Sequence, residues 1–175
     1  MANPPVPSPR TFTVSETETG GYLNTVRDAL NFLLNRPVAV ITQTTAQSNS
    51  TASAITFNAT TVDTYGGHSN STNNSRYTAQ VAGWYWVRGN VLFVSNVTGN
   101  RSCQLYKNGT ALTTSFVVYP AASTNYAAMG FETSTLVFLN AGDYVELFAS
   151  QDSGGALNTY VATGSSNLQL WFMHA

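Results

Sequence analysis

The chain has 175 residues, enough for one ordinary domain with some additional segment. Only 9% of the residues are charged and the formal net charge is −1, so no run of Lys or Arg favours nucleic acid as a partner. Cys103 is the single cysteine, which excludes an internal disulfide and a cysteine-based metal site, and no apolar stretch approaches the roughly 20 residues of a membrane span.

Residues 1–14 are predicted to form an extended arm. Four prolines in this segment favour a polyproline conformation, which has no internal hydrogen bonds. Such an arm cannot fold alone, so we expect it to be either disordered or laid along the surface of a partner.

Residues 15–36 are predicted to form the one substantial helix. Segment 15–18 has the spacing of a capping box, Gly20 and Gly21 favour a start near residue 22, and Pro37 ends the helix. Apolar residues at intervals of three and four define one face: Tyr22, Leu23, Val26, Leu30, Leu33 and Leu34. A helix of this length is marginal in isolation. Its apolar face must therefore dock, either on the chain's own β-domain or on copies of itself or a host assembly.

From residue 37 to the end the pattern is β throughout, with no interleaved helix. Short runs rich in β-branched and aromatic residues alternate with turn clusters, and Asn108-Gly109 is the sharpest hairpin signal. Strands are predicted at 38–45, 53–58, 75–81, 84–95, 102–107, 112–118, 131–139, 143–150 and 167–174. This pattern predicts a mainly β domain, an antiparallel β-sandwich or jelly roll.

Three segments of this region resemble domains of the C1q/TNF-like family. Residues 77–85 lead from an aromatic strand to a G-x-Y pattern, 105–109 end in K-N-G, and 139–147 read L-x-x-G-D-x-V-x-L. No F-S-G-x-L precedes the last strand, and residues 153–157 are the nearest match. The resemblance covers about residues 50 to 175 and implies a C1q/TNF-like jelly roll over 37–175.

The strand that follows Gly83 is apolar on both of its faces. A period of two places Tyr85 and its alternate neighbours in the core and leaves Trp84 and Trp86 outside, a patch that monomers rarely expose. The C1q-like family packs three jelly rolls around an axis, so the resemblance implies a homotrimer. The predicted trimer interface is Trp84, Trp86, Leu92, Trp171 and Met173. The alternative is a monomer in which the helix covers this face.

The order of segments in the whole chain resembles virion proteins of tailed actinobacterial phages, often labelled minor tail proteins. The resemblance rests on the Pro-rich opening and on residues 22–35 and 63–70. It implies synthesis in the bacterial host cytoplasm, a location on the virion surface, and other phage virion proteins of the capsid or tail as partners. The predicted virion-anchoring residues are Pro4, Pro5, Pro7, Pro9, Phe12, Tyr22, Leu23, Val26, Leu30, Leu33 and Leu34.

Two functions remain in view. The first is a capsid decoration or head-fibre trimer anchored by residues 1–36, which the short chain without a fibrous stalk favours. The second is a tail-associated receptor-binding module that contacts host cell-surface glycans. Loop tyrosines suited to sugar contact in that case, or to ordinary loop packing, are Tyr65, Tyr119, Tyr126 and Tyr160.

No catalytic motif is present in the sequence. His68 and His174 lie in no metal-ligand pattern, and His68 is predicted to be a solvated loop residue. Asp143 follows a glycine in a hairpin, where a structural role in the turn is expected. Some C1q-like domains bind calcium through loop carboxylates, but no dense Asp/Asn run supports that here. We therefore expect no enzyme activity, no cofactor and no metal.

Overall fold

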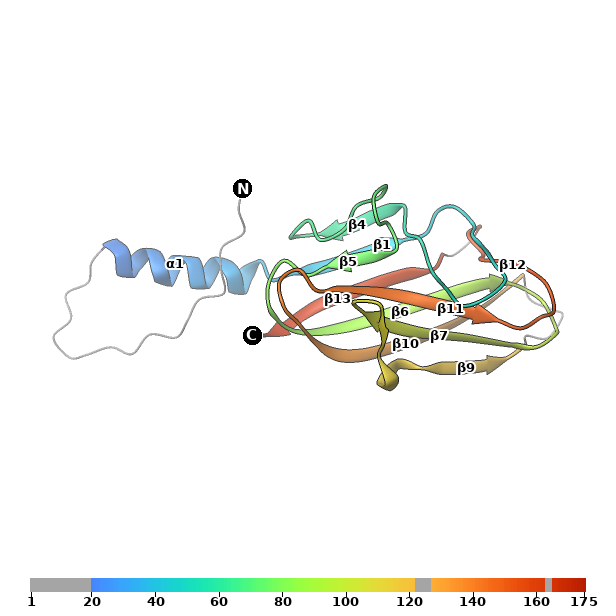
Figure 1. The fold of residues 1–175 in the computed structure, drawn as a ribbon. Helices are drawn as coiled ribbons and strands as arrows, with labels where there is room; N and C mark the ends of the chain where they lie inside the picture. Colours follow the sequence, from blue (N-terminus) through green and yellow to red (C-terminus); the bar gives the residue numbers. More distant parts are fainter. Residues whose placement is uncertain (1–19, 122–126, 163–164) are drawn as a thin grey trace.

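The computed structural model describes residues 20–121, 127–162 and 165–175 and shows one helix followed by a β-sandwich (Figure 1). The elements in chain order are α1 (Gly20–Leu34), β1 (Val38–Thr42), β2 (Ser48–Asn49), β3 (Ser53–Ala54), β4 (Ala59–Asp63), β5 (Arg76–Thr78), β6 (Gly83–Val94), β7 (Asn100–Lys107), β8 (Thr110–Ala111), the 3-10 turn η1 (Thr113–Ser115), β9 (Val117–Pro120), β10 (Ala128–Leu139), β11 (Tyr144–Gln151), β12 (Leu157–Asn158) and β13 (Asn167–His174).

Two antiparallel sheets form the layers of the sandwich. One has the strand order β10-β6-β13-β1-β4, and the other has the order β3-β11-β7-β8, with β5 also paired to β11 and β9 to β7. A short ladder joins β12 and β2. Strands distant in sequence, such as β1 and β13, are neighbours, and successive strands often change sheet. This connectivity is that of a jelly roll, as the sequence predicts.

The core lies between the two sheets and is built by strict alternation along the long strands. Tyr85, Val87, Val91 and Phe93 on β6 are fully buried, while their neighbours in sequence point outward. In β13 the inward residues are those at 168, 170 and 172. The hydroxyl of Tyr85 donates to the carbonyl oxygen of Val81 at 2.7 Å, so its polar end is satisfied inside the core. The predicted faces of both strands are confirmed.

Two of the turns that carry the family resemblance are tied together. Asn108 and Gly109 have φ of 50° and 77°, which confirms the tight hairpin between β7 and β8. The carboxylate of Asp143, in the turn before β11, lies 2.9 Å from the ammonium of Lys107 and accepts from Asn108 Nδ2 at 2.7 Å. The Asn140 N–H donates to its second oxygen at 2.8 Å. The bonds from Lys107, Asn108 and Asn140 hold the pKa of Asp143 well below its usual range, and its predicted structural role is confirmed.

Some strand boundaries differ from those predicted. Residues 112–118 were expected to be one strand, but η1 interrupts them. The buried Ser115 side chain accepts the N–H of Leu105 at 3.0 Å and donates to the carbonyl of Leu112 at 2.7 Å, so its hydroxyl replaces ladder bonds.

The prediction of a strand at 53–58 was also too long, because regular pairing ends at Ala54. Beyond it, the N–H of Ile55 donates to Leu147 O and that of Phe57 donates to Asn74 O, each outside a regular ladder. The edge strand β4 was not predicted, since its polar sequence ATTVD lacks apolar alternation.

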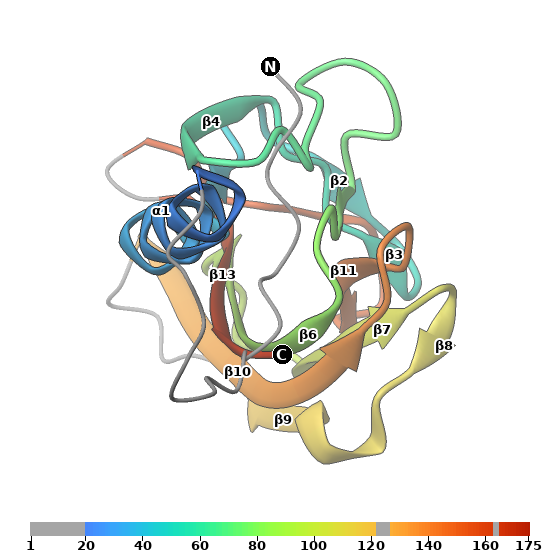
Figure 2. The ribbon, with the colours of Figure 1, turned by 90° about the vertical axis from the view of Figure 1, so that its left-hand side faces the viewer.

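The helix α1 projects beyond one end of the sandwich, the end at which β13 and the chain terminate (Figure 1). Figure 2 views the molecule along its long direction and shows α1 as an end-on coil, so the helix axis is roughly parallel to the long direction of the sandwich. Phe32 fixes it there, because its ring is buried and lies edge-to-face against Phe172 at 5.3 Å. The predicted end before Pro37 is confirmed, since the helix stops at Leu34. The described part contains no helix with the length and apolar character that crossing a bilayer requires.

Candidate interaction surface

Exposed apolar side chains gather on the outer face of the sheet β10-β6-β13-β1-β4. The strand register places the side chains of β10, β6 and β13 in two adjacent rows, Phe138–Trp84–His174 and Leu136–Trp86–Trp171. Met173 follows Phe172 on β13 and is 49% exposed. We call these apolar residues the outer-sheet patch: Trp84, Trp86, Leu136, Phe138, Trp171 and Met173.

Two aromatic members of the patch, Trp84 and Phe138, contact each other as aromatic side chains do in a protein interior. The ring of Trp84 lies edge-to-face against Phe138 at 5.7 Å and 6.3 Å from the ring of His174. Nevertheless Trp84 and Trp86 remain 36% and 40% exposed. Preordered aromatic side chains with uncovered surface are typical of protein–protein interfaces.

Polar residues limit the patch along the strands. Beyond Trp86 the next row of β6 contains Arg88, which forms an ion pair with Glu132 of β10. Leu92 lies on the same face but beyond this row and beyond Asn90. The structure therefore brings together four of the five residues predicted for the interface and separates Leu92 from them.

Sequence reasoning missed two members of the patch, Leu136 and Phe138, which are 46% and 38% exposed. Alternation along 131–139 would have found them, because Val137 and Leu139 point inward and their neighbours must point outward.

The helix leaves most of its apolar side chains uncovered. Of the predicted anchoring residues, the exposed fractions are 54% for Leu23, 38% for Val26, 53% for Leu30, 61% for Leu33 and 85% for Leu34. Residues 1–14, with Pro4, Pro5, Pro7, Pro9 and Phe12, and the side chain of Tyr22 lie outside the described part of the structure. Helix α1 does not cover the outer-sheet patch, and its own apolar stripe stays exposed. The structure therefore does not show the alternative monomer in which the helix covers the outer face of the sheet. The residue that docks it, Phe32, was not predicted.

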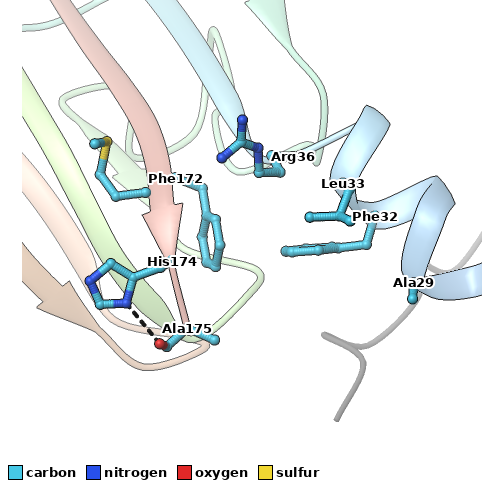
Figure 3. Close-up of a pocket in the computed structure, with 8 residues that line it drawn as sticks. Ala29, Phe32, Leu33, Arg36, Phe172, His174 and Ala175 are labelled. Carbon is cyan, nitrogen blue, oxygen red and sulfur yellow. Dashed lines mark hydrogen bonds between the residues drawn. The ribbon is translucent and has the colours of Figure 1, made fainter. Parts of the chain in front are cut away.

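A cavity of about 260 Å³ lies where the helix meets the end of β13 (Figure 3). Phe32 and Leu33 line it from α1, and Phe172, Met173 and His174 line it from β13. Its walls are mainly apolar. Because Leu33 belongs to the helix stripe and Met173 to the outer-sheet patch, the cavity connects the two uncovered surfaces.

The polar depression beside the β4–β5 loop is structural. It has a volume of about 280 Å³ and contains His68, whose Nδ1 and Nε2 lie 2.9 and 3.2 Å from the carbonyl oxygens of Arg76 and Phe57. The expectation that His68 is a solvated loop residue is wrong, because its ring is half-buried and both ring nitrogens lie within hydrogen-bond distance of backbone carbonyl oxygens. Asp63 accepts the N–H groups of Tyr65 and His68 and so shapes the same loop.

Other titratable groups serve the core. Tyr65, for which either sugar contact or ordinary loop packing was open, is buried, as loop packing requires, and burial raises the pKa of its hydroxyl. Burial also raises the pKa of the Cys103 thiol to about 12. Tyr126 lies outside the described residues. Within residues 20–121, 127–162 and 165–175, no group of His, Cys, Asp and Glu side chains is arranged to hold a metal ion.

The fold is that of C1q and TNF-family domains. The globular domain of the zebrafish complement 1qA protein is similar with a TM-score of 0.55 and 12% identity, over 79% of this chain and 98% of that one. Murine APRIL at pH 5.0 is similar with a TM-score of 0.58 and 12% identity, over 78% and 98% of the two chains. No family profile and no curated protein matches the sequence. The likeness defines a C1q/TNF-like jelly-roll fold.

Proposed function

We propose that the chain is a non-enzymatic structural protein that assembles into a homotrimer through the outer-sheet patch. The observation that carries this proposal is the patch itself, in which aromatic and aliphatic side chains stand in two adjacent rows and most of them are exposed. Burying such a surface gives a favourable free energy of about 25 cal/mol per Å² of apolar area.

The composition supports association rather than catalysis. Only 9% of residues are charged, and long charged side chains are those that the centres of interfaces exclude. The one ion pair beside the patch, Arg88 with Glu132, lies within the chain and leaves no net charge to oppose a second copy. The resemblance to a family that packs three jelly rolls around an axis favours three copies.

The proposed setting is the surface of a phage particle, as a capsid decoration or head-fibre protein made in the host cytoplasm. The resemblance of the whole chain to virion proteins of tailed phages supports this setting. Residues 1–36 serve as the anchor toward another virion protein. Helix α1 projects from the end of the sandwich, which suits a segment that connects the β-domain to a particle (Figure 1).

A second candidate is a tail-associated module that binds host cell-surface glycans. Exposed aromatic side chains away from the patch favour it: Phe116 is 56% and Tyr119 is 39% exposed. Phe116 lines a groove of about 240 Å³ together with Gln104, Tyr106 and Phe148. Aromatic rings beside an amide side chain are suited to stacking on sugars.

The trimer is tested first by light scattering on the purified full chain. A mass near three times 18.8 kDa is expected, and a mass of 18.8 kDa at all concentrations refutes the trimer. Location is tested by quantifying the protein in purified particles. Many copies on the capsid support decoration, whereas few copies at the tail support receptor binding.

The anchor is tested by deleting residues 1–36. The β-sandwich core lies almost entirely after this segment, so the truncated chain should keep its β-type circular dichroism. It should be absent from particles that incorporate the full chain. Incorporation of the folded, truncated chain at the normal level contradicts the anchoring role.

A further inference from the structure

The apolar stripe of α1 has the spacing of a coiled coil. Leu23, Val26, Leu30 and Leu33 are separated by three, four and three residues, which assigns them to heptad positions a, d, a and d. All four are among the exposed large hydrophobic residues. The four successive seam positions contain no polar residue, and the chain's own sheet leaves all of them uncovered.

The helix uses a different face to attach to its own domain. Phe32 lies at heptad position c, about a third of a turn away from the a/d seam. It is 3% exposed and packs on Phe172, and the ring of Phe172 in turn packs edge-to-face on Tyr85 at 5.3 Å. The carbonyl of Pro37 accepts the N–H of Phe172 at 2.9 Å, which fixes the link that follows the helix. The attachment therefore orients α1 and leaves the seam open.

The direction of the helix suits association with copies of itself. The helix runs along the length of the sandwich (Figures 1 and 2), so a three-fold axis in this direction would place three helices parallel to one another. The cavity of Figure 3 is lined by Leu33 of the seam and by Met173 and His174 at the end of the outer sheet. The seam and the outer-sheet patch therefore border the same cavity.

We propose that α1 forms a parallel three-helix bundle with the same helix of two further copies. The inference rests on the proposed homotrimer. It assigns the apolar stripe of the helix to two further copies of this chain and, within residues 1–36, leaves the anchoring contact with another virion protein to residues 1–14. The bundle brings the N-terminal ends of three α1 helices together at one end of the trimer.

The side chains at and beside the seam support this occupant. Two-stranded coiled coils favour β-branched residues at a and Leu at d, whereas here Leu occupies both a positions and Val26 occupies a d position. Arg27, at e, pairs with Asp28 of the same helix at 2.9 Å, and the g position at 29 is Ala, so no like charges meet between helices. Two heptads are too short to associate alone, but the linked β-domains supply a high effective concentration.

The test uses cysteine cross-linking in the full-length protein. Val26→Cys places a thiol in the seam, and its matched control Asn24→Cys places one at an exposed b position on another face. The native Cys103 is 1% exposed with a pKa raised to about 12, so it does not react with a maleimide near neutral pH. A second pair one turn on, Leu30→Cys and Asn31→Cys, guards against a local defect in either variant.

With a short bis-maleimide, the Val26→Cys chains should form covalent dimers about tenfold faster than the Asn24→Cys chains. Because each trimer has three thiols and one linker joins two, no more than two chains in three should become dimers, and the native mass should stay that of three chains. Equal rates for the two variants in a protein of three-chain mass overturn the bundle and leave the β-domain trimer standing. Covalent products of six-chain native mass overturn it as well, because the helices then join different trimers. A one-chain mass removes the trimer and the bundle with it.

Discussion

Removal of the Trp86 indole tests the outer-sheet patch at its most exposed tryptophan. Trp86 lies between Leu136 on β10 and Trp171 on β13 and is 40% exposed. A tryptophan offers about 250 Å² of surface, so about 100 Å² remains to be covered by a partner. At about 25 cal/mol per Å² this surface contributes up to ~2.5 kcal/mol per chain, or ~7 kcal/mol per trimer.

This free energy converts into a large change in the concentration at which trimers dissociate. For three identical chains the midpoint concentration varies with the square root of the dissociation constant. About half of the ~7 kcal/mol therefore determines the change in the midpoint concentration. Trp86→Ala should therefore raise the midpoint by up to about 2.5 orders of magnitude. Sedimentation velocity over a dilution series measures the midpoint directly.

A matched control separates the interface from general surface effects. Phe116 is more exposed than Trp86, at 56%, and lies outside the patch, so Phe116→Ala should leave the midpoint unchanged. Far-UV circular dichroism shows whether each variant keeps its fold. A folded Trp86→Ala protein with the wild-type midpoint, or an equal shift in both variants, would refute the assignment of the patch.

Two further predictions concern stability. Gly83→Ala should lower the free energy of unfolding by about 1–3 kcal/mol in urea denaturation, because the added Cβ would lie 2.5 Å from the Phe172 ring and 2.7 Å from the His174 carbonyl oxygen. The control Gly155→Ala should have little effect on this free energy, because nothing lies within 4 Å of the added Cβ. Asp143→Asn should cost about 1–2 kcal/mol at pH 7. Because the pKa of Asp143 is lower in the folded than in the unfolded protein, its carboxylate stabilises the fold fully above the unfolded pKa of about 3.9 and loses this effect as the pH falls toward the folded pKa. The difference in unfolding free energy between the wild type and Asp143→Asn should therefore narrow below about pH 4. A constant difference down to about pH 2 would contradict the stabilising role of the Asp143 carboxylate.

The faces of the long strands could be predicted because each side chain there obeys one local rule. Alternation along β6 and β13 separates Tyr85 from Trp84 and Phe172 from Met173 without any knowledge of their partners. The hairpin at Asn108 could be predicted for the same reason, since positive φ is a property of the local sequence. The fold class and most of the patch follow from these local rules.

Other features depend on contacts between distant segments and had no local signature. Phe32 docks only because Phe172, at the far end of the chain, forms the other half of the contact. His68 is held by carbonyls of two separate segments, and Ser115 ends a strand because it binds Leu105 of a neighbouring strand. In each case a tertiary contact overrides what a loop or a strand pattern suggests.

The residues that carry the family resemblance differ in role from the residues that would mediate association. Gly83 lacks the Cβ that would meet Phe172, Asn108 turns the β7–β8 hairpin, and Asp143 joins that hairpin to its neighbour. All three act inside one chain, and they explain why the fold can be shared at low identity. Between Gly83 and Tyr85 the G-x-Y pattern leaves one position unspecified, and here it is occupied by the outward-facing Trp84. The proposed association would therefore be encoded at positions that the shared fold leaves free. The likeness defines the architecture, and the partner must be found by testing the outer-sheet patch and the helix seam.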